Sequence, residues 1–126
     1  MSNIDLIIEE RAASIGSFMV GRLLPFRQKR AVGPFVFLDH IDPAQLDKIT
    51  HFDVLPHPHI GLATLTYLFE GEIMHRDSIG SVQRITPGAV NWMTAGSGVV
   101  HSERTPEELR SKAHKLHGLQ IWVALP

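Results

Sequence analysis

Two short histidine-containing motifs carry most of the chemistry in this sequence. His57-Pro58-His59 is followed further along the chain by His101-Ser102-Glu103. Side chains two positions apart on a β-strand point to the same face, so two such strands can aim four side chains into one small volume. Three imidazoles and one carboxylate form a donor set that suits a first-row transition metal. The predicted metal ligands are His57, His59, His101 and Glu103.

The donor set also indicates which chemistry the metal would serve. It contains the two-histidine, one-carboxylate arrangement of non-haem iron(II) oxygenases, which leaves coordination positions open for substrate and dioxygen. Dioxygen reacts slowly with closed-shell organic molecules because of its triplet ground state, and a redox-active metal that binds both partners bypasses that barrier. Residual positive charge on such a metal also favours a deprotonated substrate hydroxyl. We therefore predict that Glu103 is both a ligand and the general base for that hydroxyl.

Chance is the competing interpretation of an isolated His-X-His pair, because the chain has eight histidines among 126 residues. The downstream His-X-Glu motif and the surrounding glycines favour metal binding. His75 follows the turn at Gly71, from which it can reach the mouth of the barrel, but the favoured interpretation is an exposed imidazole or one satisfied within the core. Trp92 and Met93 are interpreted as core residues. The other histidines have no convergent spacing and are left out of the site: His40, His51, His114 and His117.

Composition indicates one folded domain. Hydrophobic residues make up 44% of the chain and charged residues 20%, which is ordinary for a globular protein. A net charge of -1 gives no electrostatic reason to expect nucleic acid or an anionic membrane as a partner. There is no cysteine, which excludes a disulfide framework and a thiolate site. No segment approaches the roughly 18 apolar residues of a membrane span, and the N-terminus lacks a signal-peptide pattern. We therefore expect a cytoplasmic protein.

The elements that must position the motifs are short strands separated by turn residues, a pattern that favours an all-β sandwich or barrel. Two segments with a capping residue followed by proline predict short helical turns, one from Asp42 to about Ile49 and one beginning at Thr105. The closing strand ends at Pro126, so we expect a longer parent protein. An apolar strand at a terminus can pair edge to edge with its copy, so we also expect a homodimer. The predicted strands cover residues 4–8, 16–24, 35–40, 62–69, 73–77, 82–85, 89–94, 99–103 and 119–125.

The two motifs belong to a longer pattern that resembles the pirin family of the cupin superfamily. The resemblance runs from about Arg22 to Pro126. It implies a single cupin-type antiparallel β-barrel (a double-stranded β-helix or jelly roll) with short helical turns. It also implies that the barrel holds one divalent transition metal, usually iron(II), on the residues matching the four predicted ligands. The pattern comprises His57-Pro58-His59, Tyr67-Leu68-Phe69-Glu70-Gly71, His75-Arg76-Asp77-Ser78-Ile79-Gly80, Pro87-Gly88, Trp92-Met93-Thr94-Ala95-Gly96 and His101-Ser102-Glu103.

The resemblance implies two kinds of function. Some pirins cleave the flavonol quercetin with dioxygen, so the first expectation is a dioxygenase that acts on a flavonol-like aromatic hydroxy compound. Others are described as transcriptional co-regulators, so the alternative is a non-catalytic metal-binding module that acts through protein–protein contacts. Manganese, nickel, copper, cobalt and zinc are alternatives to iron.

Two features depart from the family pattern. Pirins usually have two cupin domains in a chain about twice this long. We therefore expect residues 1–126 to form one domain, similar to the N-terminal metal-bearing domain, with the second domain absent. The general cupin motif also places a glutamate four or five positions after its His-X-His, where this sequence has Ala63 and Thr64. The carboxylate ligand is therefore expected at Glu103, in agreement with the pirin pattern.

Overall fold

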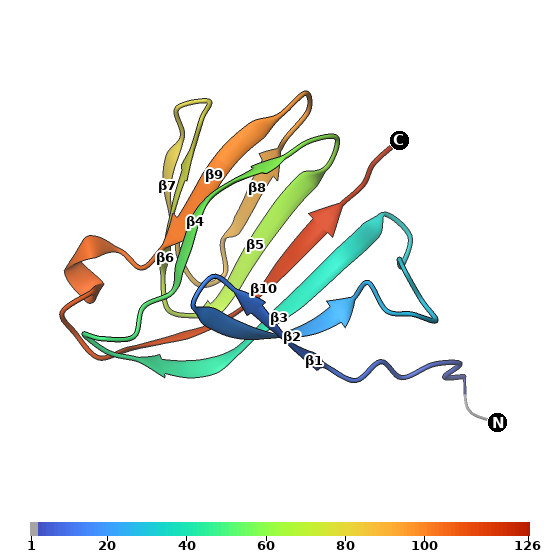
Figure 1. Ribbon diagram of the computed structural model, residues 1–126, viewed down its shortest axis with the longest axis horizontal. Coiled ribbons are helices and arrows are strands. Elements are labelled where there is room, and N and C mark those ends of the chain that lie inside the picture. Colours follow the sequence, from blue (N-terminus) through green and yellow to red (C-terminus); the bar gives the residue numbers. More distant parts are fainter. Residues whose placement is uncertain (1–2) are drawn as a thin grey trace.

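Two antiparallel β-sheets face each other in the computed structural model, which describes residues 3–126 (Figure 1). The six-stranded sheet has the order β1-β2-β3-β10-β5-β8 and the four-stranded sheet the order β4-β9-β6-β7. The predicted all-β architecture is confirmed, although the two sheets are not closed into a continuous barrel. The strands are β1 Arg11–Ile15, β2 Phe18–Leu24, β3 Phe35–Leu46, β4 Asp53–His59, β5 Ala63–Glu70, β6 Ile73–Asp77, β7 Val82–Ile85, β8 Val90–Thr94, β9 Val99–Arg104 and β10 His114–Val123.

The hydrophobic core lies between the sheets because each strand alternates buried and exposed side chains. On β5, Thr66 and Leu68 are buried, whereas Tyr67 between them is partly exposed, as the two-residue period of a strand requires. The rings of Phe18 and Phe52 meet edge to face at 5.2 Å and connect β2 to the segment that enters β4. The main core cluster consists of Phe18, Val20, Ile41, Leu46, Phe52, Leu68, Ile73, Ile85 and Leu116.

The closing strand β10 lies in the middle of the six-stranded sheet, where β3 and β5 pair with its two edges. The expectation that this terminal strand offers a free edge was wrong, because both sides of its backbone are already paired. Pairing of β10 with its copy is therefore not a route to a dimer. The homodimer itself stays a prediction.

Two further local predictions were wrong. Asp42 to Gln45 does not form a helical turn but continues β3, with Ala44 opposite Leu116 of β10. Pro43 has no backbone N–H, and it lies beside the register shift in β10 between Leu116 and Gly118, the kind of irregularity that accommodates proline in a sheet. Residues 4–8 belong to no strand, because an apolar pattern becomes a strand only where a neighbouring strand supplies hydrogen bonds.

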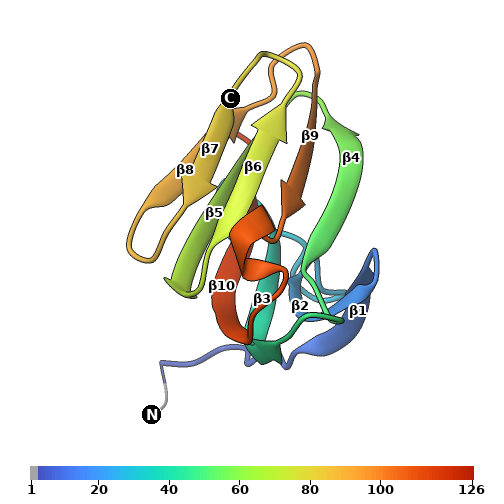
Figure 2. The same ribbon diagram turned by 90° about the vertical axis from the view of Figure 1, so that its left-hand side faces the viewer.

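The second predicted helical turn is confirmed as a short 3-10 helix, η1 (Glu107–Leu109), between β9 and β10 (Figure 2). Thr105 does not cap it; its hydroxyl instead accepts the backbone N–H of Phe52 at 2.9 Å. Arg110 follows η1 and binds both carboxylate oxygens of Asp53 at 2.9 and 2.8 Å, which attaches the turn to the start of β4. Within residues 3–126, no helix is long and apolar enough to span a membrane.

Gly118 is expected to be intolerant of any side chain. A Cβ atom there would lie 2.6 Å from the carbonyl oxygen of Tyr67 and 2.7 Å from Leu68 Cδ2, so the backbone of β5 must shift. Gly118→Ala should lower the free energy of unfolding by about 1–3 kcal/mol in urea denaturation. Gly96→Ala is the control, since its Cβ meets no atom within 4 Å and costs only the strain of a positive φ. A smaller loss for Gly118→Ala than for Gly96→Ala would contradict the packing argument.

Candidate metal centre

Strands β4 and β9 position the two histidine motifs. They pair antiparallel, with His57 opposite His101 and Val54 opposite Glu103. Between these two pairs, β4 advances by three residues while β9 advances by two. This irregularity lets both motifs direct side chains between the sheets. β4 is an edge strand of its sheet, which explains why Pro58 fits between the two histidines without breaking the sheet.

The structure brings the three predicted histidines together. One ring nitrogen from each of His57, His59 and His101 lies within 4.8 Å of the others, and their ring centroids are 4.4 to 5.0 Å apart. His59 and His101 are buried, and His57 is half-buried. Glu103 does not join all three histidines. Its Oε1 is 4.0 Å from His101 Nδ1, and it forms a second group with His75 and His101, in which one potential ligand atom from each residue lies within 4.8 Å of the others.

The hydrogen-bond pattern leaves Nε2 of His57 and of His101 free to bind a metal. His57 Nδ1 lies 2.8 Å from the carbonyl oxygen of Leu55, which can only accept, so the proton sits on Nδ1 and Nε2 keeps its lone pair. His101 Nε2 is buried and has no hydrogen-bond partner among the described residues. An orphaned, buried ring nitrogen beside two other imidazoles fits a metal ion, because unpaired buried polar atoms are otherwise costly.

Burial keeps the imidazoles of His59 and His101 neutral. It lowers the pKa of His101 to about 3, with further lowering by the charges of His57 and His59. Burial also lowers the pKa of His59, and His57 adds to the effect. A metal needs the neutral, deprotonated imidazole, so both rings are in the binding form at neutral pH. Burial raises the pKa of Glu103, against the hydrogen bond from Thr66, and a bound cation would favour its ionised form.

A cavity of about 70 Å³ adjoins the histidines between the two sheets. Phe37 and Trp122 stack face to face at 3.9 Å and form one wall. Asp39, which also faces the cavity, is neutralised by two hydrogen bonds from Arg22 at 2.8 Å. By the same measure a water molecule needs about 10–15 Å³, so the cavity holds several molecules of the size of water or dioxygen. Its lining consists of Ile15, Phe37, Asp39, Ile41, Phe52, Val54, His57, His101, Glu103, Gln120 and Trp122.

Sequence analysis left His75 out of the site. It is 2% exposed, so the interpretation as a histidine satisfied within the core is confirmed and the exposed alternative was wrong. Its contact with the cluster was missed, because its Nδ1 lies 3.3 Å from His101 Nδ1. Its Nε2 lies 2.8 Å from Asp77 Oδ2. A signal was present in the sequence, because His75 and Asp77 have the same two-residue spacing as the two ligand motifs.

Other sequence expectations also changed. His40 and His117 come together with their Nε2 atoms 3.0 Å apart, and His40 also contacts Glu10 and Asp42, but this group lies apart from the three-histidine cluster. Met93 is buried as predicted. Trp92 is 47% exposed, so the prediction that it is a core residue was wrong.

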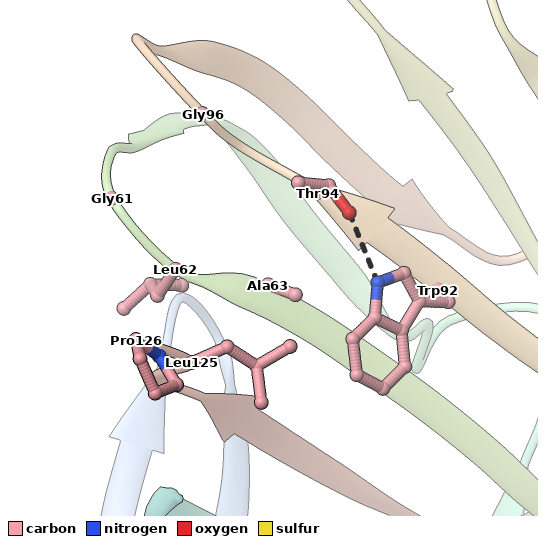
Figure 3. Close-up of a pocket in the computed structure, with 8 residues that line it drawn as sticks. All are labelled: Gly61, Leu62, Ala63, Trp92, Thr94, Gly96, Leu125 and Pro126. Carbon is pink, nitrogen blue, oxygen red and sulfur yellow. Dashed lines mark hydrogen bonds between the residues drawn. The ribbon is translucent and has the colours of Figure 1, made fainter.

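A separate hollow of about 260 Å³ lies where β5, β8 and the C-terminal residues meet (Figure 3). Trp92 forms one side, and its indole N–H donates to Thr94 Oγ1 at 3.0 Å. Its lining offers no acid, base or metal-ligating side chain, so we assign it no chemistry. The lining residues are Gly61, Leu62, Ala63, Trp92, Thr94, Gly96, Leu125 and Pro126.

Comparison with known proteins identifies the family. Residues 17–123 match the Pirin family. The chain belongs to the pirin family. A pirin-like protein of Caulobacter vibrioides is 58% identical over 98% of this chain and 43% of its own length. The crystal structure of a quercetin 2,3-dioxygenase from Acinetobacter baumannii superposes with a TM-score of 0.86 at 46% identity, covering 94% of this chain and 38% of that one.

A bacterial pirin from Escherichia coli, solved in complex with nickel(II), superposes with a TM-score of 0.70 at 25% identity over 91% of this chain and 48% of that one. The cupin-type fold implied by the resemblance is thereby confirmed. This pirin chain spans less than half the length of the relatives it matches.

The lowered pKa of His101 predicts how acid affects the metal-free protein. Below about pH 6.5 the unfolded chain binds a proton at His101 that the folded chain accepts only near pH 3, so stability falls as the pH falls. The raised pKa of Glu103 acts in the opposite direction. Replacing His101 alone isolates its effect. With a chelator present to keep both proteins metal-free, the free energy of unfolding should fall less between about pH 7 and pH 5 in His101→Gln than in wild type. The difference between the two falls should be about 2 kcal/mol. Equal losses in urea denaturation would contradict the prediction.

Proposed function

We propose that this chain binds one divalent transition metal, iron(II) as the working ion, through His57, His59, His101 and Glu103. With that metal it cleaves a flavonol-like aromatic hydroxy compound with dioxygen. The observation that carries the proposal is the buried, unpartnered Nε2 of His101 beside the two other imidazoles. The likeness to a protein described as a quercetin 2,3-dioxygenase supports the substrate class. The nickel(II) complex of another pirin supports a metal at this fold.

The residues around the metal divide the chemistry. When bound, the metal supplies a Lewis acid and a one-electron redox partner that allow triplet dioxygen to react. Glu103 takes the proton of the substrate hydroxyl as the general base; burial raises its pKa, and a bound cation would act against that effect. Thr66 Oγ1 lies 2.9 Å from both Glu103 Oε1 and Gln120 Oε1. Its single proton can be donated to only one of these acceptors, and donation to Glu103 orients the carboxylate. Phe37 and Trp122 give the cavity an apolar wall.

The size of the cavity favours a second candidate function. At about 70 Å³ it is far smaller than the roughly 300–1,000 Å³ of pockets that enclose a drug-sized ligand. A flavonol must therefore displace part of the wall or keep its rings outside the cavity. A non-catalytic metal-binding module, which acts on another protein through its metal state, has no such requirement.

The proposed ligands predict a pattern of metal content. After anaerobic loading with iron(II), His101→Ala and Glu103→Ala should each lose most of the bound iron, measured by mass spectrometry of the metal. His114→Ala is the matched control and should keep the wild-type content, because it is not in the cluster. Circular dichroism of the metal-free variants separates a lost ligand from a lost fold. Equal iron in all three variants would reject the ligand assignment.

The proposed reaction predicts selectivity for a free hydroxyl. The iron(II)-loaded protein should consume quercetin together with dioxygen, and it should leave 3-O-methylquercetin intact, because methylation removes the proton and blocks coordination. Glu103→Gln should keep more iron than Glu103→Ala but turn over about 10²–10⁴-fold more slowly, because an amide cannot accept the proton. Oxygen uptake and the loss of flavonol absorbance measure both effects. If quercetin and dioxygen are untouched, the dioxygenase proposal fails and the metal-binding module remains.

A further inference from the structure

A buried His–Asp pair lies directly behind the three-histidine cluster. β6 pairs with β9 so that Asp77 lies opposite His101 and His75 lies opposite Glu103. His75 Nδ1 lies 3.3 Å from His101 Nδ1, and His75 Nε2 lies 2.8 Å from Asp77 Oδ2. The side chains of His75 and Asp77 are 2% and 3% exposed. The three side chains form a continuous buried chain of polar contacts that ends at His101.

One placement of protons satisfies this chain with neutral rings. An ionised Asp77 only accepts, so His75 Nε2 carries the proton and donates it to the carboxylate. A neutral His75 then has a bare Nδ1, which accepts a hydrogen bond from His101 Nδ1. With its proton on Nδ1, His101 has a lone pair on Nε2, the atom that is buried without a partner among the described residues.

We propose that Asp77 and His75 are positioning residues that hold His101 in the tautomer required for metal binding. The inference rests on the metal centre of the proposed function but not on the dioxygenase reaction. A metal-binding histidine usually donates its second N–H to a carboxylate or a carbonyl oxygen, and loss of that partner typically lowers metal affinity 10- to 100-fold. In this protein the imidazole of His75 lies between His101 and the carboxylate of Asp77.

The turn after β6 determines which atom of Asp77 faces His75. Asp77 Oδ1 accepts the backbone N–H groups of Ile79 at 3.1 Å and Ser81 at 3.0 Å, so Oδ2 is the atom directed at His75. In Asp77→Asn the same N–H groups keep the amide oxygen in the turn and direct the NH2 group at His75. His75 Nε2 must then accept, its proton moves to Nδ1, and the proton of His101 moves to Nε2. The two hydrogen bonds made by His75, to residue 77 and to His101, remain with reversed direction, but His101 Nε2 loses the lone pair that binds the metal.

Histidine tautomers in the metal-free protein test this directly. Long-range proton–nitrogen NMR spectra at neutral pH should place the His101 proton on Nδ1 in wild type and on Nε2 in Asp77→Asn. His57 is the internal control, since its Nδ1–H donates to Leu55 and should not change. A wild-type His101 with its proton on Nε2, or with two protons, would overturn the proposal.

Affinity for cobalt(II) alone, measured by calorimetry, tests the consequence for binding. Asp77→Asn and His75→Leu should each bind about 10- to 100-fold more weakly than wild type. The double variant should lose no more than His75→Leu, because both residues act through one chain. His75→Gln should recover most of the affinity, because its amide can accept from His101 and donate to Asp77. Asp53→Asn is the matched control: it loses its ion pair with Arg110 and one of the two hydrogen bonds, and it should keep the wild-type affinity.

A purely structural role for Asp77 predicts a different result. Asp77→Asn would then lower the melting temperature of the metal-free protein and leave the His101 tautomer unchanged, which would refute the inference. Wild-type cobalt(II) affinity in Asp77→Asn would also refute it, while the proposed function would stand. If wild type binds no cobalt(II), the proposed metal centre fails, and the tautomer spectra alone decide the role of Asp77.

Discussion

Burying three imidazoles and a carboxylate between two apolar sheets costs free energy, and hydrogen bonds from the surrounding structure offset part of that cost. His57 donates to a backbone carbonyl, Glu103 accepts from Thr66, and His101 contacts His75. Burial also keeps His59 and His101 uncharged, which avoids the larger cost of buried positive charge. Among these four side chains, the buried ring nitrogen that the structure leaves without a hydrogen-bond partner is Nε2 of His101. The fold therefore uses hydrogen bonds to leave a lone pair where a metal would use it.

The two sheets contribute different parts of this environment. The four-stranded sheet supplies the histidines, Glu103 and Asp77, because β4, β9 and β6 are neighbours and each carries a motif with two-residue spacing. The six-stranded sheet supplies the apolar wall of Phe37 and Trp122 and the polar pair Thr66 and Gln120. Separation of these roles matters because an apolar wall lowers the local dielectric constant and so strengthens electrostatic interactions at the site. The extra residue of β4 sets the relative alignment of the two ligand motifs.

The small cavity and the family relationship point in different directions for the substrate. Similarity to a quercetin 2,3-dioxygenase favours a flavonol, whereas about 70 Å³ of space beside the histidines matches a molecule the size of dioxygen. Both hold if the flavonol reaches the site with only its hydroxyl end and its rings remain at the mouth. A metal-binding module requires no opening for a flavonol, so a flavonol bound with its aromatic rings at the entrance of the cavity would distinguish the two functions.

The amino-acid sequence alone determined the features that depend on local patterns. Strands at Ile73–Asp77 and Val82–Ile85 were predicted to the residue, because turn residues flank them. The convergence of the three histidines also followed from their two-residue spacing. Only the tertiary structure decided features that depend on distant partners. Pairing with β10 turned the segment around Pro43 into a strand, and pairing with β9 brought His75 against His101. Spacing fixes the face of a strand to which a side chain points, whereas the neighbouring strand and its register are set by long-range packing.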